Sequence, residues 1–273
     1  MKAKEVTELL ERVRTNQPLI YNITNIVVAN FNANGILSMG ASPVMANAVE
    51  EAEDMAMAAD ALVLNIGTLD RAQVESMKRA GKAANQKGIP VVLDPVGAGA
   101  TPYRTNTAKD LLQLLDISLL RGNAGEISTI AGLDSEMKGV DSAGVDKDTK
   151  RIAEYAARKL DVPTAVTGPV DAVSDGSSTY TIFNGHSIMA RVTGTGCLAS
   201  AVAASFLSQA DNVLEGTAAA LGYYGIAAER AEGFTAGQGP GTFQAELLNG
   251  LYQVGEMDLR QNVEIRWEHA GHE

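Results

Sequence analysis

The segment Ile89-Pro-Val-Val-Leu-Asp94-Pro-Val-Gly-Ala-Gly99 joins a short apolar run to a turn that contains Asp94 and two glycines. An apolar run without alternation is typical of a strand that is buried on both faces of a sheet. Comparable runs lie at 61–65, 117–120 and 164–167, and helical segments separate them. Strands that alternate with helices predict a mostly parallel central sheet with helices on both faces. We therefore expect an α/β fold.

The other expected elements continue this alternation and show no linker or repeat, so we expect a single domain over residues 1–273. The spacing of Val6, Leu9, Leu10 and Val13 predicts a first amphipathic helix. Further strands are expected at 19–21, 44–46, 170–174, 178–183 and, as a late edge strand, 263–267. Further helices are expected at 25–39, 50–59, 70–86, 105–115, 148–160, 197–209, 213–232 and 241–255, with a surface loop over 133–148.

Composition narrows the classes of partner and the compartment. The 273 residues carry a net charge of −11, which argues against nucleic acid as a partner. One cysteine excludes an intrachain disulfide and fits a reducing cytoplasm. No apolar run approaches the length of a transmembrane helix, and the N-terminus lacks the apolar core of a signal peptide. We therefore expect a cytoplasmic protein.

Polar residues and glycines follow four of the predicted strands. They are Asn65-Ile-Gly67, Asp94-Pro-Val-Gly97, Arg121-Gly-Asn123 and Thr167-Gly168. The carboxyl ends of parallel strands meet at one edge of the sheet, where ligands bind in open α/β folds. That edge is the candidate site.

Asp94 and Glu126 are the candidate metal residues at this edge. Carboxylate oxygens suit Mg²⁺, which keeps several waters and usually binds together with substrate phosphates. The alternative is that Glu126 caps its own helix and that Asp94 belongs to an Asp-Pro turn. Spacing alone does not decide between these two interpretations.

Arg121 and Thr167 are the candidate phosphate contacts. A guanidinium group binds a phosphate with two parallel hydrogen bonds and keeps its charge at neutral pH. A surface ion pair for Arg121 and an ordinary turn at Thr167-Gly168 are the alternatives.

Val192-Thr-Gly-Thr-Gly-Cys197 reads as a glycine-rich turn that leads into a helix of small residues. Gly194, Thr195 and Gly196 can aim several backbone N–H groups at an anion at the helix N-terminus. Cys197 lies at the start of that helix, where the pKa of a thiol is expected to be lowered, so that it can accept a proton. A tight turn and a small core cysteine fit the same residues. No Walker lysine and no conventional nucleophile triad is present.

Seven segments together resemble the hydroxyethylthiazole kinase family of the ribokinase-like superfamily, from Pro18 to Leu248. They are Asn22-Ile-Thr-Asn25, Gly40-Ala-Ser-Pro-Val-Met45, Val63-Leu-Asn-Ile-Gly-Thr68, Leu93-Asp-Pro-Val-Gly-Ala-Gly-Ala-Thr-Pro102, Arg121-Gly-Asn-Ala-Gly-Glu126, Gly194-Thr-Gly-Cys197 and Gly239-Pro-Gly-Thr-Phe-Gln-Ala-Glu-Leu-Leu248. The resemblance implies a three-layer ribokinase-like fold and ATP-dependent phosphorylation of the hydroxyl of 4-methyl-5-(2-hydroxyethyl)thiazole, a salvage step towards thiamine. It also implies Mg²⁺ and a homotrimer with the thiazole bound between subunits.

The resemblance assigns roles to individual residues. Met45 and Gly194 match thiazole contacts, Asn25 lies in the loop that approaches substrate, Arg121 and Thr167 match ATP contacts, and Asp94 and Glu126 match the region near the metal. Cys197 stands where the wider superfamily usually has an aspartate base, which leaves the strength of the base open. Tyr21 stands where many members have histidine, and Thr195 where some have alanine.

Three other functions fit parts of the same pattern. A kinase acting on the pyrimidine alcohol of the same pathway can share Gly194-Thr-Gly-Cys197, but is not expected to share the pattern from Asn22 to Met45. An ATP-dependent dehydratase acting on hydrated nicotinamide nucleotides is expected to carry Asp at position 197. A non-catalytic thiazole-binding or regulatory protein is the third alternative. It gives no reason to retain together Asp94, Arg121, Asn123, Glu126 and the 194–197 turn.

Overall fold

The computed structural model describes residues 1–133 and 145–269. Within these residues the strands form a single sheet in the order β2-β1-β3-β4-β5-β6-β7-β8-β9. The six strands from β2 to β6 pair in parallel, whereas β7, β8 and β9 extend the sheet by antiparallel pairing. The bounds are β1 Leu19–Ile23, β2 Ser42–Met45, β3 Ala61–Asn65, β4 Val91–Asp94, β5 Leu119–Asn123, β6 Thr164–Thr167, β7 Asp171–Ser174, β8 Ser178–Ile182 and β9 Ile265–His269.

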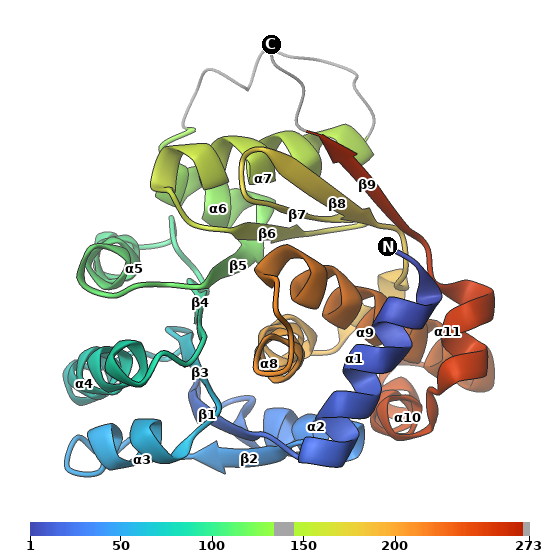
Figure 1. Cartoon of the computed structure of the whole chain (residues 1–273), viewed down its shortest axis with the longest axis horizontal. Coiled ribbons are helices and arrows are strands. Elements are labelled where there is room, and N and C mark those ends of the chain that lie inside the picture. Colours follow the sequence, from blue (N-terminus) through green and yellow to red (C-terminus); the bar gives the residue numbers. More distant parts are fainter. Residues whose placement is uncertain (134–144, 270–273) are drawn as a thin grey trace.

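Helices cover both faces of the sheet, as expected for an α/β fold (Figure 1). One face carries α3 Ala52–Ala58, α4 Arg71–Lys87, α5 Pro102–Leu114, α6 Ala124–Ala131 and α7 Val145–Leu160. The other carries α1 Ala3–Asn16, α2 Ala29–Met39, α8 Thr195–Leu207, α9 Val213–Thr235, α10 Pro240–Gln253 and α11 Glu256–Asn262. The three-layer architecture that the sequence predicts is therefore confirmed.

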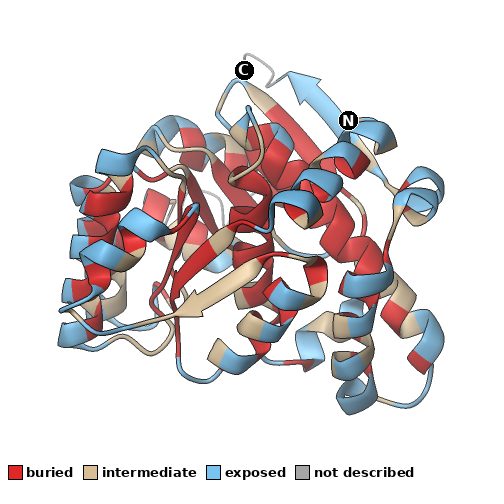
Figure 2. Ribbon diagram, turned by 60° about the horizontal axis from the view of Figure 1, so that its bottom comes forward, coloured by how far each residue is buried: buried red, intermediate tan, exposed pale blue. Residues whose placement is uncertain are grey.

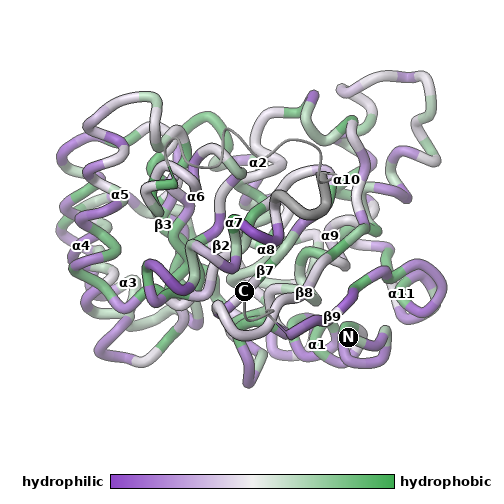
Figure 3. Tube along the Cα trace, turned by 90° about the horizontal axis from the view of Figure 1, so that it is seen from above, coloured by the Kyte–Doolittle hydropathy of each residue, from purple (hydrophilic) through white to green (hydrophobic). Residues whose placement is uncertain are grey.

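Successive strand residues alternate between two hydrophobic clusters, one on each face. In β1, Ile20 packs with α1, α2 and α8, whereas Tyr21 packs with α3 and α4. The strands are buried throughout the middle of the sheet, and exposed residues lie on the outer turns of the helices (Figure 2). The outward-facing sides of α4 and α11 are hydrophilic, as Figure 3 shows. No helix in the described part of the chain combines the length and apolar character that crossing a membrane requires.

Helix boundaries follow local capping chemistry. Helix α4 begins where the Asp70 carboxylate accepts a hydrogen bond from Gln73 N (2.8 Å) and ends at Gly88, whose φ is +79°. Helix α5 begins at Pro102, three residues before the expected start, because Thr101 caps it and proline is favoured in the first turn.

Two other boundaries differ more from the prediction. The helix expected over 25–39 begins only at Ala29, because Asn25 closes a turn by accepting a hydrogen bond from Val28 N (3.2 Å). The strand expected over 117–120 runs instead over β5, so Arg121-Gly-Asn123 belongs to the ladder and not to a turn after it.

The structure differs from the prediction at the surface loop expected over 133–148. Helix α7 already begins at Val145, inside that expected loop, while residues 134–144 lie outside the described residues. The short 3₁₀ helix Ser187–Arg191 and helix α11 were not expected from the sequence at all.

Candidate active site

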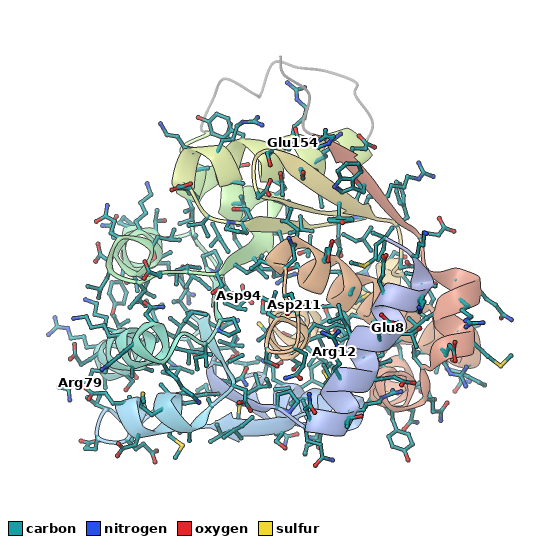
Figure 4. All side chains as sticks on the ribbon, viewed as in Figure 1. Glu8, Arg12, Arg79, Asp94, Glu154 and Asp211 are labelled. Atoms are coloured by element: carbon teal, nitrogen blue, oxygen red, sulfur yellow. The ribbon has the colours of Figure 1, made fainter. Side chains whose placement is uncertain are left out.

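The candidate site lies at the carboxyl edge of the parallel strands, where the N-terminus of α8 approaches the sheet. Strand register places Asn65 of β3 beside Asp94 of β4, and Asn123 of β5 beside Thr167 of β6. Figure 4 shows Asp94 in the middle of the molecule next to β4, while Arg79 projects from the outer surface of α4. The sequence-predicted residues at this edge are therefore brought together.

Asp94 is fully buried and is the centre of a polar network. Its Oδ2 accepts hydrogen bonds from Asn65 Nδ2 (2.9 Å) and Ser200 Oγ (2.8 Å), and Arg121 Nη1 lies 3.7 Å away. Burial raises the pKa of Asp94 from 3.8 to about 6, although the Arg121 charge and the hydrogen bonds oppose this shift. Asp94 Oδ1 has no hydrogen-bond partner among the described residues. The carboxylate thus keeps one oxygen free for a ligand.

Glu126 is held by main-chain donors. Its Oε2 accepts from Asn123 N (2.9 Å), while Asn123 Oδ1 accepts from Glu126 N (2.9 Å), which makes a capping box at the start of α6. Its Oε1 accepts from Gly97 N (2.8 Å) in the loop after β4. The capping interpretation of Glu126 is therefore confirmed. Among the described residues, no group of three His, Cys, Asp or Glu is arranged to hold a metal ion.

Arg121 joins strand β5 to the first turn of α8. It is 7% exposed, donates from Nη1 to Gly196 O (2.9 Å) and donates from Nη2 to Thr167 Oγ1. A surface ion pair, the alternative interpretation of Arg121, is wrong because this guanidinium is buried. Arg121, Thr167 and Asp94 form one continuous polar cluster below the α8 N-terminus.

The turn before α8 requires glycine at position 194. Gly194 has φ +91°, and a Cβ added there would lie 2.6 Å from Val28 Cγ1. Thr195 Oγ1 donates to the carbonyls of Met189 (2.9 Å) and Val192 (3.1 Å), so its side chain faces the preceding turn. The first N–H groups of a helix have no partner within the helix, so the chemistry of this turn is suited to an anion.

Cys197 is the third residue of α8, and its Sγ accepts a hydrogen bond from Asn25 Nδ2 (3.3 Å). Burial raises the pKa of the thiol to about 11, and the Asp94 charge adds to the shift. The amides of Asn65 and Asn25 and the Arg121 charge oppose it. The expectation of a lowered pKa is therefore wrong, because burial outweighs the position at a helix N-terminus.

Two asparagines connect Cys197 to Asp94, and main-chain donors fix the orientation of both. Asn65 Oδ1 accepts from Gly67 N (3.0 Å) and Asn25 Nδ2 (3.1 Å), which leaves Asn65 Nδ2 facing Asp94. Asn25 Oδ1 accepts from Val28 N, so its Nδ2 faces Asn65 and Cys197. Since an N–H group can only donate, neither amide can be flipped without losing a hydrogen bond.

Met45 and Tyr21 lie on different sides of the sheet. Met45 ends β2, is partly buried and packs against the cluster that contains α2 and α8. Tyr21 is fully buried in the cluster on the opposite face, where burial raises the pKa of its hydroxyl to about 12. Its side chain therefore faces away from the α8 turn.

Sequence reasoning did not assign roles to Ser200 or Arg104. Ser200 lies three residues after Cys197 on α8, so the helical period places both on neighbouring parts of one face. That spacing is the signal that could have identified Ser200. Arg104 shows no comparable signal, because its guanidinium donates to the backbone carbonyls of Ile66, Val96 and Gly67.

Comparison with known proteins gives consistent matches over nearly the whole chain. The model of the hydroxyethylthiazole kinase family matches residues 10–257. The chain is 48% identical over 263 residues to a hydroxyethylthiazole kinase of Moorella thermoacetica, covering 96% of this chain and 98% of that one. It is 43% identical to the solved structure of a hydroxyethylthiazole kinase protein from Pyrococcus horikoshii, with a TM-score of 0.90 and coverage of 97% and 99%.

More distant structures share the fold alone. A Staphylococcus aureus pyridoxal kinase solved in complex with ADP is 14% identical, with a TM-score of 0.63, covering 93% of this chain and 99% of that one. A ribokinase-like superfamily protein from Enterococcus faecalis is also 14% identical, with a TM-score of 0.64, covering 92% of this chain and 95% of that one.

Proposed function

The chain belongs to the hydroxyethylthiazole kinase family, and on that premise we propose that it transfers the γ-phosphoryl group of ATP to the hydroxyl of 4-methyl-5-(2-hydroxyethyl)thiazole, in thiamine salvage. Family membership makes the chain a phosphotransferase with an alcohol acceptor. The observation that carries the finer proposal is the cluster of Asp94, Arg121 and Thr167 directly below the N-terminus of α8.

The α8 turn is the proposed anion hole for the transferred phosphoryl group. In-line phosphoryl transfer needs mainly positioning and stabilisation of charge on the phosphoryl oxygens. Backbone N–H groups of residues 194–197 supply donors at the positive end of the helix dipole. Arg121 holds the Gly196 carbonyl and Thr167 hydroxyl, so it supports the turn as well as placing positive charge beside the ATP phosphates.

Mg²⁺ fits this site through Asp94. Its buried Oδ1 has no partner in the described part of the chain, and a hard oxygen ligand is what Mg²⁺ prefers. Glu126 is engaged by Gly97 N and Asn123 N, so it shapes the loop beside the metal and adds negative charge near Asp94. Bound Mg²⁺ would neutralise phosphate charge as transfer proceeds.

Asn25, Met45 and Gly194 are the proposed contacts to the thiazole alcohol. Asn25 and Gly194 both border the start of α2, because Asn25 closes the turn just before that helix and a Cβ added at Gly194 would lie 2.6 Å from Val28 Cγ1. Cys197 is the neighbouring group for the acceptor hydroxyl. With its pKa raised to about 11, the thiol is protonated at neutral pH, so it is a modest base at most. A loose transition state demands little from a base.

We propose that the chain forms one kinase domain, that three copies assemble into a homotrimer, and that the enzyme acts in the cytoplasm. The continuous sheet supports the single domain. Ile26 and Val27 are 76% and 65% exposed beside the substrate residue Asn25, and Leu37 of α2 is 57% exposed. Exposed apolar side chains next to a site support its location between subunits.

The decisive test is ADP release from Mg²⁺-ATP by the purified protein, with the thiazole alcohol, with the pyrimidine alcohol of the same pathway, and with neither. We expect stimulation by the thiazole alcohol that exceeds stimulation by the pyrimidine alcohol and is lost when EDTA removes Mg²⁺. Equal ADP release with and without the thiazole alcohol would exclude the proposed reaction. Light scattering tests the trimer, and a strict monomer would contradict a site shared between subunits.

A further inference from the structure

Arg104, in the first turn of α5, contacts the backbone of two loops at the carboxyl edge. Its Nη1 donates to Ile66 O (2.9 Å) and Val96 O (2.9 Å), and its Nη2 donates to Gly67 O (2.8 Å). Ile66 and Gly67 follow β3, whereas Val96 lies in the loop after β4. One guanidinium therefore binds both loops at once.

Each of these loops continues directly from a residue of the polar network. Asn65 precedes Ile66, and Asn65 Oδ1 also accepts from Gly67 N (3.0 Å). Asp94 lies two residues before Val96, and the next residue, Gly97, donates to Glu126. A Cβ on Gly97, whose φ is +77°, would lie 3.1 Å from Arg104 Cδ, so the β4 loop packs closely on the arginine side chain.

We propose that Arg104 is a positioning residue that holds the β3 and β4 loops at a fixed separation. This separation keeps Asn65 aligned between Asp94 on the phosphate side and the Asn25–Cys197 pair on the acceptor side. The inference rests on the proposed function for its catalytic consequence, but its geometric consequence is independent of activity.

The geometry of the guanidinium explains why arginine occupies this position. Its planar fork directs two nitrogens at three carbonyl oxygens, two in the loop after β3 and one in the loop after β4. Lysine has one nitrogen on a flexible stem, so it cannot reproduce the two ends of the fork. A misplacement of about 1 Å at a reacting centre can lower turnover about 100-fold.

The chain contains a matched control in Arg14 of α1. Arg14 Nη2 donates to the carbonyls of Leu251 (3.2 Å), Tyr252 (3.2 Å) and Val254 (2.9 Å), at the end of α10. It therefore also binds three backbone carbonyls, but in a region that contributes no residue to the proposed site. Loss of either arginine removes similar hydrogen bonds, so a merely structural role predicts similar consequences.

The first experiment compares Arg104→Ala, Arg104→Lys and Arg14→Ala for urea-unfolding midpoint, kcat and KM. We expect the two alanine variants to lose stability to a similar extent. We expect kcat to fall about 10- to 100-fold in Arg104→Ala only, with a much smaller change in KM for ATP. Arg104→Lys should recover part of kcat, and low concentrations of guanidinium ion should raise kcat of Arg104→Ala but not of Arg14→Ala. Equal kcat in the folded Arg104→Ala and Arg14→Ala proteins would overturn the proposal.

The second experiment measures alkylation of Cys197, the single cysteine of the chain, by iodoacetamide without substrates. Loosening of residues 65–67 should loosen the Asn65–Asn25–Cys197 hydrogen bonds. We expect several-fold faster alkylation in Arg104→Ala and an unchanged rate in Arg14→Ala. This readout separates the two hypotheses: a wild-type protein inactive on the thiazole alcohol contradicts the proposed function, whereas equal alkylation rates in both variants contradict the role of Arg104.

Discussion

Asparagine and aspartate lie at both edges of the parallel sheet, but their hydrogen-bond partners differ. At the amino edge, Asn85 Nδ2 donates to Asp116 O (2.8 Å), and Asp116 N donates to Asn85 Oδ1 (2.9 Å). This amide is satisfied by backbone alone. At the carboxyl edge, Asn65 instead bonds the buried side chain of Asp94, whose Oδ1 has no partner in the described part of the chain.

The difference separates a structural edge from the edge that we propose to be reactive. A buried polar atom without a partner costs about 1–3 kcal/mol, so natural proteins keep few of them. Within residues 1–133 and 145–269, the buried atoms without a hydrogen-bond partner at the carboxyl edge include Asp94 Oδ1 and Arg121 Nε. Such atoms are retained where a ligand completes them, which is the interpretation we give to this edge.

Asp94→Asn should give the largest contrast between the edges. The change removes the charge proposed to face Mg²⁺, so we expect kcat/KM to fall about 100- to 1000-fold, the scale on which preorganised electrostatic groups act. Asp116→Asn at the amino edge should alter kcat/KM less than about twofold, because its contacts to Asn85 use the backbone. Steady-state ADP release measures both. Comparable losses in the two variants would remove the distinction between the edges.

The pH dependence of stability should come next in size. Burial raises the pKa of Asp94 from 3.8 to about 6, so the folded state binds its proton more tightly than the unfolded state. Protonation of Asp94 therefore stabilises the folded state. This contribution to the unfolding free energy is complete below about pH 4 and is lost as the pH rises through 6. It amounts to about 3 kcal/mol for a shift of this size. Urea unfolding of the wild type at pH 4 and pH 7 should show the decline.

Asp94→Asn should remove part of that decline, whereas Asp116→Asn should leave it unchanged. Burial also raises the pKa of Asp171 to about 6, so Asp171 contributes to the pH dependence of the unfolding free energy in both variants. An Asp94→Asn protein with the full wild-type difference between pH 4 and pH 7 would show that Asp94 is not the source.

Alanine substitutions of one glycine at each edge compare how tightly the two edges are packed. Gly194 and Gly88 both have positive φ, at +91° and +79°, so alanine is strained at either position. A Cβ added at Gly194 would lie 2.6 Å from Val28 Cγ1, whereas a Cβ added at Gly88 would have no atom of the described residues within 4 Å. We expect Gly194→Ala to lower the unfolding free energy by about 1–3 kcal/mol more than Gly88→Ala, the usual cost of overpacking. Equal losses in urea unfolding would show that Val28 moves aside freely.

The sequence predicted the architecture well because apolar runs fix the buried strands. The strands at 61–65 and 164–167 have the predicted bounds. Strand β5 was misplaced because Gly122 looks like a turn residue, yet it pairs with Val166 in the ladder. Local pattern does not reveal which glycines a neighbouring strand will pair.

The membership of the candidate site was predictable only in part, and its energetics were not predictable. Asp94, Arg121 and Gly194 could be named from strand-end and turn patterns. Ser200 bonds a carboxylate 106 residues away, and Arg104 bonds Gly67, 37 residues away. The pKa of Cys197 depends on burial by segments distant in sequence. Spacing along α8 could have placed Ser200 beside Cys197, but the hydrogen-bond partners of Ser200 and Arg104 and the pKa of Cys197 arise from tertiary packing.

Cys197→Asp should have the smallest effect on activity. It distinguishes proton transfer by the side chain from charge stabilisation by the backbone N–H groups of the turn. An aspartate is mostly ionised at neutral pH, whereas the thiol is protonated, so the variant has the stronger base. We therefore expect turnover to be kept or modestly raised, because backbone N–H groups of the turn, which the substitution leaves in place, carry the charge stabilisation. The new carboxylate faces the charge of Asp94, which limits the gain. Cys197→Ser serves as the matched control for size without a base. Loss of all ADP release in a folded Cys197→Asp protein would mean that the thiol has a role beyond proton transfer.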